Sequence, residues 1–70
     1  MTGAEFIRRV RAVGRTRGVE VYFRSRQGKG SHGRLYYGKR FTTVKDRKKE
    51  ISRSLLATML RQLGLSAKDL

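Results

Sequence analysis

Residues 19–44 read VEVYFRSRQGKGSHGRLYYGKRFTTV and contain three short runs rich in β-branched and aromatic side chains. In the first run, residues 19–24, Val19, Val21 and Phe23 alternate with polar or amphipathic residues, which is typical of a half-buried strand. Residues 34–37 predict the second strand and residues 40–44 the third. Between them, Gly38-Lys39 suits a tight hairpin with glycine at its first central position. The stretch therefore predicts three antiparallel strands.

An amphipathic helix is expected before these strands. Thr2 and Glu5 have the spacing of a capping box, so this helix should begin at about Gly3. Gly14 suits a left-handed helix end. Apolar residues recur at helical spacing in between, and arginines lie on the other faces: the apolar set is Phe6, Ile7, Val10 and Val13.

A second helix is expected after the strands. Residues 45–50, KDRKKE, are too charged to be buried and are interpreted as a solvated connection, with phosphate contact as the alternative. Ser52 is the expected N-cap, and Gly64 the expected end, with Leu65 folding back on the helix. The tail, residues 66–70, is expected either to form a short capped turn or to fray. The predicted apolar face of the helix consists of Leu56, Met59, Leu60 and Leu63.

The order helix, three strands, helix predicts an α+β fold, a two-layer sandwich with a three-stranded antiparallel sheet and both helices on one face. The other sheet face is then open. Tyr22, Arg24 and Tyr36 are expected there together with further basic side chains, a mixture that can stack bases and hold phosphates. The alternative is that the two tyrosines are ordinary amphipathic cover.

The 70 residues predict one domain, residues 1–70, with a modest core. Lys and Arg number 18 against five Asp and Glu, for a net charge of +13, and this excess concentrates polyanions around the protein. Nucleic acid is therefore the first candidate partner, and an acidic protein is the second. The sequence shows neither a membrane span nor a signal peptide, so we expect a cytoplasmic protein that does not bind membranes.

The one histidine, His32, lies inside a glycine-rich basic turn that reads Gly28-Lys29-Gly30-Ser31-His32-Gly33. An imidazole gains or loses a proton near neutral pH, so an exposed histidine in a basic chain is a candidate for proton transfer on RNA. RNA supplies its own nucleophile, the 2′-hydroxyl. A chain with no cysteine and one histidine is poorly suited to a thiolate or histidine-rich metal centre. We therefore expect metal-free chemistry without a cofactor, the alternative being an ordinary surface or core histidine.

Other groups near His32 are candidates for binding the scissile phosphate. Lys29, Arg34 and the backbone amides of Gly30 and Ser31 are the nearest, because glycine-rich turns can direct several N–H groups at one anion. Simple solvation of Lys29 and Arg34 is the alternative. Ser31 either orients the imidazole or closes the turn through its own hydrogen bond.

The order of these segments, the Gly30-Ser31-His32 turn between the first two strands and the ending Leu60-Arg61-Gln62-Leu63-Gly64-Leu65 together resemble the HicA toxins of bacterial type II toxin–antitoxin modules. The resemblance covers nearly the whole chain. It implies a double-stranded-RNA-binding-like αβββα fold, metal-independent endoribonuclease activity on mRNA with His32 as the catalytic residue, and silencing by a HicB-like antitoxin. That partner is expected to be acidic and to form a hetero-oligomer with the chain.

The chain departs from the family pattern at two places. Many members have a histidine or a bulky residue after the catalytic histidine, whereas this chain has Gly33, which predicts a more open local pocket. The stretch after the third strand often contains a Pro-His pair in the family, and here it reads Lys45-Asp46-Arg47. Only the role of His32 is therefore carried over.

A second hypothesis is a non-catalytic RNA-binding module of the double-stranded-RNA-binding type, because the same fold and charge would serve it. Such modules usually bind RNA through basic residues at the start of the second helix. Here the segment Ile51-Ser52-Arg53-Ser54-Leu55 carries one cation, which disfavours that reading. A DNA-binding role is weaker still, since no helix-turn-helix spacing is present.

Overall fold

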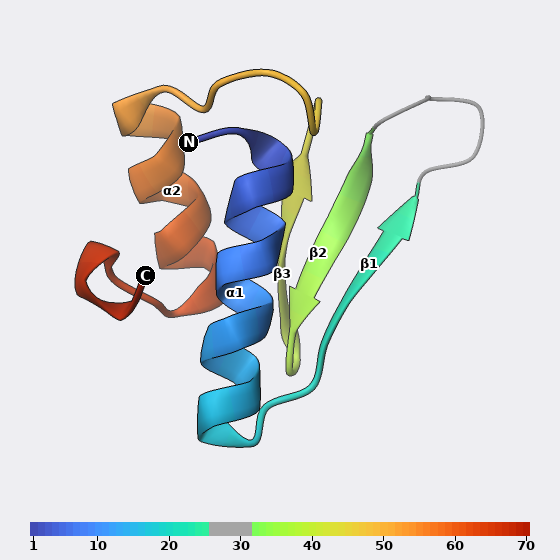
Figure 1. The fold of residues 1–70 in the computed structure, drawn as a ribbon, viewed down its shortest axis with the longest axis vertical. Coiled ribbons are helices and arrows are strands. Elements are labelled where there is room, and N and C mark those ends of the chain that lie inside the picture. Colours follow the sequence, from blue (N-terminus) through green and yellow to red (C-terminus); the bar gives the residue numbers. More distant parts are fainter. Residues whose placement is uncertain (26–31) are drawn as a thin grey trace.

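A computed structural model of the chain describes residues 1–25 and 32–70. Its strands form one antiparallel sheet in the order β1-β2-β3, and both helices pack on the same side of that sheet (Figure 1). The predicted αβββα two-layer sandwich, which is the double-stranded-RNA-binding-like fold, is confirmed. In chain order the elements are α1 (Gly3–Arg17), β1 (Val21–Ser25), β2 (Gly33–Tyr37), β3 (Arg40–Val44), α2 (Arg53–Leu63) and the short 3-10 helix η1 (Ala67–Asp69).

The core lies between the helices and the inner face of the sheet. Leu35, on the central strand, is fully buried, and Val21 and Phe23 pack against the core from β1, as their alternation predicts. Among the described residues, Thr42 is the buried polar one. Its hydroxyl donates a 2.6 Å hydrogen bond to the Gln62 side chain of α2, which joins sheet and helix. Further buried hydrophobic residues in the described part of the chain are Phe6, Ile7, Val10, Val44, Met59, Leu60, Leu63 and Leu65.

Helix α1 begins where the sequence predicts. The Thr2 hydroxyl accepts a 3.2 Å hydrogen bond from the Glu5 N–H, which is one half of the capping box. The Glu5 side chain does not make the predicted bond to the Thr2 backbone N–H. It accepts one from Arg9, one turn further along, at 3.0 Å. This i, i+4 pair crosses the helix surface.

The predicted end of α1 at Gly14 is wrong. The helix continues to Arg17 and ends at Gly18, whose φ of 69° is in the left-handed region. Gly14 is buried, and a Cβ atom there would lie 2.4 Å from Cγ2 of Val21. Its carbonyl also accepts a 2.8 Å hydrogen bond from Val19, which holds Val19 in the turn and makes β1 begin two residues later than predicted.

Helix α2 has the predicted ends. The Ser52 hydroxyl accepts from the Leu55 N–H at 3.2 Å, and Gly64 adopts a φ of 74°. Leu65 folds back as expected, because it is buried and its N–H donates to the Leu60 carbonyl at 2.8 Å. Among residues 1–25 and 32–70, neither helix has the length and apolar character that a membrane span requires.

Residues 45–50 are solvent-exposed apart from Asp46, as the sequence predicts, and they also contact the start of α1. The carbonyls of Arg47 and Lys49 accept hydrogen bonds of 2.9 Å and 3.2 Å from the N–H groups of Ala4 and Gly3. Backbone N–H groups in the first turn of a helix have no partner within the helix, so the connection satisfies donors that would otherwise need water. This segment is thereby fixed to the start of α1.

The tail forms a capped turn, one of the two outcomes expected for it. The Ser66 N–H donates to the Asp69 carboxylate at 2.8 Å, and Arg17 of α1 donates to the same carboxylate. The bond from Ser66 and then that from Arg17 lower the pKa of Asp69. The stabilisation from this carboxylate is therefore present above the ordinary pKa of Asp and is lost as the pH falls through the lowered value.

Candidate active site

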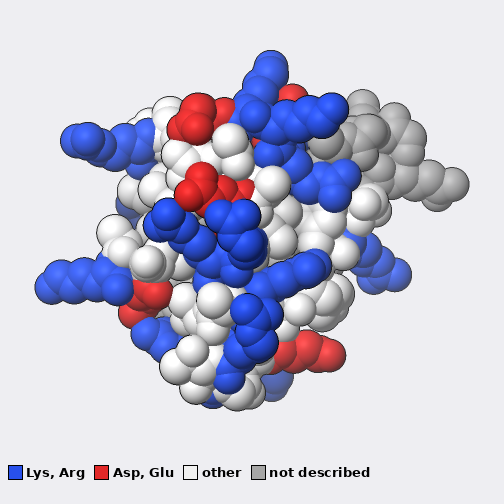
Figure 2. Space-filling model, viewed as in Figure 1, with Lys and Arg blue, Asp and Glu red and all other residues white. Residues whose placement is uncertain are grey.

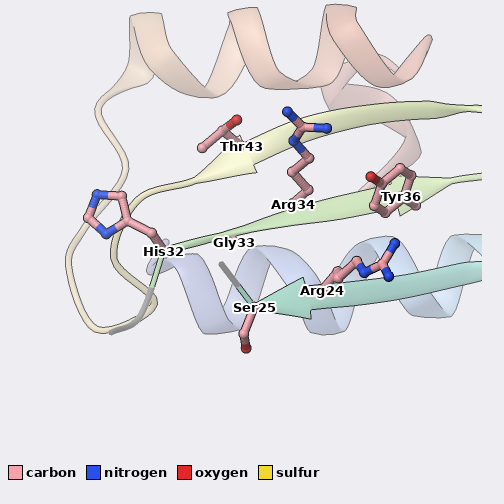
Figure 3. A pocket seen from close by; sticks show the side chains of 7 residues that line it. All are labelled: Arg24, Ser25, His32, Gly33, Arg34, Tyr36 and Thr43. Carbon is pink, nitrogen blue, oxygen red and sulfur yellow. The ribbon is translucent and has the colours of Figure 1, made fainter. Parts of the chain in front are cut away.

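His32 lies immediately before β2, at the end of the sheet where β1 finishes (Figure 3). It is half-buried and lines a hollow of about 360 Å³ on the open sheet face. Arg24, Arg34, Tyr36 and Thr43 project into this hollow from three neighbouring strands, whereas Ser25 points away (Figure 3). The structure therefore brings together four residues singled out in the sequence: Arg24, His32, Arg34 and Tyr36.

His32 also lines a second hollow, of about 380 Å³, on its other side. The connection after β3 contributes two lysines, Lys45 and Lys49, and two carboxylates, Asp46 and Glu50, to this hollow. Helix α2 contributes apolar side chains. His32 thus lines two hollows that differ in charge. In the part of their lining that the structure describes, the first carries two arginines and no carboxylate, whereas the second carries as many carboxylates as lysines. An RNA phosphate is therefore better matched by the first hollow.

The two arginines of the first hollow are direct cross-strand partners. Arg24 pairs with Arg34 in the register of β1 and β2, and both side chains are on the open face. Like charges at directly opposed positions destabilise a sheet. A phosphate between the two guanidinium groups would remove that repulsion, so this pairing favours an anion-binding site.

Phe41 and Thr43 belong to the same face, and neither is among the site residues predicted from the sequence. The Arg34 guanidinium lies 4.6 Å from the centre of the Phe41 ring, a cation–π contact that holds this arginine over β3. Thr43 is the cross-strand partner of Arg34. Lys45 is two residues beyond Thr43, and side chains two residues apart in an extended chain lie on the same face. This spacing in the sequence could have identified Lys45 as a neighbour of the site.

Lys29, Gly30 and Ser31 lie outside the described residues, so their predicted phosphate contacts remain predictions. Gly33 is described, and the expectation that it opens the pocket is wrong. A Cβ atom there would lie 2.3 Å from the Phe23 ring and 2.6 Å from the Arg24 carbonyl oxygen. The Phe23 ring occupies the space of the missing side chain, on the inner face of the sheet.

Replacing Gly33 by alanine should therefore destabilise the fold. Overpacking of this kind costs about 1–3 kcal/mol, and each kcal/mol lowers the melting temperature of a domain this small by about 4–8 °C. Thermal unfolding followed by circular dichroism measures the effect. Ser25→Ala, at the exposed cross-strand partner of Gly33, is the control and should change the melting temperature little. Equal melting temperatures for Gly33→Ala and the native protein would contradict the crowding argument.

Basic side chains are also numerous away from the site, on the helical side of the molecule. Figure 2 shows Lys and Arg side chains over α1 and around the outline of the molecule, with few acidic side chains between them. This agrees with the net charge of +13. The positive potential at the open hollow therefore comes first from its own two arginines, and the net positive charge of the chain adds to it.

A family model of the HicA toxin of bacterial toxin–antitoxin systems matches residues 3–65, and the chain belongs to this family. Comparisons with curated proteins and with solved structures find no match. The family defines the class of protein: a toxin of a toxin–antitoxin system, which has an antitoxin as its partner. Toxins of this family are generally ribonucleases.

Proposed function

We propose that this chain is an endoribonuclease that cleaves mRNA without a metal ion, with His32 as its general acid or base. The observation that carries the proposal is the convergence of His32 with the opposed Arg24 and Arg34 in one open hollow. Membership of the HicA toxin family supports the same activity.

The chemistry requires two proton movements. The 2′-hydroxyl of the RNA loses its proton and attacks the adjacent phosphorus, and the 5′-oxygen leaves and takes up a proton, which gives a 2′,3′-cyclic phosphate and a free 5′-hydroxyl. The His32 imidazole serves one of these transfers, as base when neutral or as acid when protonated. Arg24 and Arg34 stabilise the negative charge that develops on the phosphate oxygens.

The test is a cleavage assay in excess chelator. Purified protein should cut an mRNA under these conditions, and the His32→Ala variant, purified identically, should not. Cleavage that stops on chelation and returns with added metal would contradict the metal-free mechanism. Cleavage by both proteins would remove His32 from the mechanism.

A non-catalytic RNA-binding module is the second candidate, and the arginines of α1 favour it. Arg8, Arg11, Arg15 and Arg17 are exposed on this helix, away from His32 and on the helical side of the molecule. Such a surface suits contacts with phosphates whether or not RNA is cut. Salt-dependent RNA binding with no cleavage product at any protein concentration would favour this function.

RNA affinity should fall log-linearly with salt because bound phosphates release condensed counterions. Each contact with single-stranded nucleic acid contributes about −0.7 to the slope of log affinity against log salt concentration. The double variant Lys45→Gln, Lys49→Gln, which removes both cations of the second hollow, should reduce the slope by about 1.4. Fluorescence anisotropy between 50 and 300 mM salt measures it.

Lys68→Gln is the matched control for that measurement. Lys68 lies in η1, near the C-terminus, and outside both hollows that contain His32. Its removal lowers the net charge without touching the proposed site. An equal slope change per charge in the control would show that the connection acts through general charge alone.

The antitoxin is proposed to be an acidic, HicB-like protein that covers His32. The charge of this chain and the exposed arginines around the hollow support an acidic partner. A partner on this face would block substrate and neutralise the arginine pair at the same time. The complex would be a hetero-oligomer of toxin and antitoxin.

A further inference from the structure

Three aromatic side chains form a row across the open sheet face, from β1 through β2 to β3. Tyr22 and Tyr36 are cross-strand partners whose rings stack with centres 4.7 Å apart and planes within 13° of each other. Phe41 pairs with Tyr36 from the other side, with ring centres 5.6 Å apart. We call Tyr22, Tyr36 and Phe41 the aromatic row.

The two ends of the aromatic row are exposed, and Tyr36 between them is partly buried. Tyr22 is 43% exposed and Phe41 is 42% exposed, and both helices pack on the opposite face of the sheet. Within the described ranges, no helix or strand covers these rings. Exposed apolar surface of this kind, bordered by charged side chains, is typical of a binding site.

The two ends of the row differ in what their ring faces contact. Phe41 has the Arg34 guanidinium over its ring. Tyr22 stands on β1, an edge strand, with one ring face against Tyr36, so its other face is turned away from the sheet. A further flat ring placed there would extend the existing Tyr22–Tyr36 stack.

The aromatic row leads directly to the proposed active site. Tyr36, Arg34 and His32 are two residues apart on one side of the sheet, so each step along β2 covers about 7 Å. Arg24 is likewise two residues from Tyr22. An aromatic row, an arginine pair and an imidazole therefore follow one another, which matches a chain that alternates flat bases with phosphates.

We propose that an unpaired RNA base stacks on the ring face of Tyr22 opposite Tyr36, while the adjoining phosphate lies between Arg24 and Arg34. A base within a duplex has neighbours on both faces, so this site selects single-stranded RNA. The proposal deepens the proposed ribonuclease function, because the same strand continues to His32. Phe41 is a positioning residue that holds Arg34.

Intrinsic tyrosine fluorescence tests the proposal directly, because the chain has three tyrosines and no tryptophan. The probe is a 12-nucleotide, fully 2′-O-methylated RNA, which lacks the attacking hydroxyl and cannot be cleaved by the proposed mechanism. The single strand should quench tyrosine emission and bind at least about 10-fold more tightly than the same strand in a duplex. Inorganic polyphosphate, which carries charge without bases, should bind without this quenching.

Two variants isolate the ring of Tyr22. Tyr22→Leu should weaken single-strand binding by roughly 10-fold, because it loses the stacking surface, and should leave polyphosphate binding unchanged. Tyr22→Phe keeps the ring and should bind like the native protein. Melting temperatures of both variants verify that the exposed position tolerates the changes.

Native affinity in Tyr22→Leu, or equal binding of duplex and single strand, would overturn the proposal. So would a Tyr22→Leu protein that keeps RNA binding and loses antitoxin binding, since the row would then be a protein interface. The outcome is separable from the proposed function because the probe does not report cleavage. Tyr22-dependent binding without cleavage of unmodified RNA would remove the ribonuclease function and leave the base site standing.

Discussion

Replacing His32 by alanine is expected to reduce RNA cleavage by at least about 100-fold while the protein stays folded. General acid–base catalysis by one side chain typically contributes 10²–10⁴-fold in rate, and His32 is the one histidine of the chain. Product formation from a labelled mRNA measures the effect. Growth of cells that express the variant without an antitoxin should recover in parallel.

The same variant should keep its fold and most of its RNA affinity. His32 is half-buried at the end of a strand and outside the hydrophobic core, so its removal leaves no large cavity. RNA affinity depends on 18 Lys and Arg side chains, none of which is changed. A lost cooperative melt would point to a structural histidine, and an unchanged cleavage rate would show that another group transfers the proton.

Local pattern was sufficient to predict most elements and their faces. The alternation in residues 19–24 places Val21 and Phe23 on the inner face and Tyr22 and Arg24 on the open face, as observed. The bounds of β3, the N-cap Ser52 and the left-handed Gly64 are also confirmed. In each case the deciding interaction lies within a few residues of the pattern that predicts it.

The third strand shows where alternation is ambiguous. Phe41 and Thr43 face solvent, whereas Thr42 and Val44 face the core, so the largest apolar side chain of β3 is on the open face. The buried position of Thr42 is satisfied by Gln62, which is 20 residues away in the sequence. The polarity of the residues in β3 alone therefore could not predict that Phe41 lies beside Arg34 on the open face.

Contacts between distant segments account for the other differences. Gly14 lies inside α1 because Val21 returns against it, and the sequence could indicate only that glycine suits a helix end. Lys45 approaches His32 because β2 and β3 are antiparallel, with Gly33 opposite Val44. Residues 45–50 are solvent-exposed apart from Asp46, as predicted, but the sequence could not indicate the hydrogen bonds that fix them to α1. The strand register and the contacts between distant segments must be known before these neighbouring residues can be identified.

Binding of the antitoxin is expected to stop RNA cleavage and to raise the melting temperature of this chain by about 10–20 °C when the free antitoxin concentration is 100-fold above the dissociation constant. A partner that binds only the folded toxin stabilises it by mass action, and a domain of this size has a small core, so the shift in melting temperature per kcal/mol is large. Co-expression with the neighbouring open reading frame, followed by co-purification, provides the complex.

The position of the antitoxin can be tested with the arginine pair. Arg24 and Arg34 repel each other across β1 and β2, so an acidic side chain between them would gain more than a single exposed ion pair does. Arg24→Gln should therefore weaken the complex and reduce its salt dependence, whereas Lys68→Gln, far from the hollow in sequence and outside it, should do neither. A complex that forms with full affinity in Arg24→Gln, or one that still cleaves RNA at the rate of the free toxin, would place the antitoxin away from His32. Inhibition would then have to act through the fold rather than by covering the site.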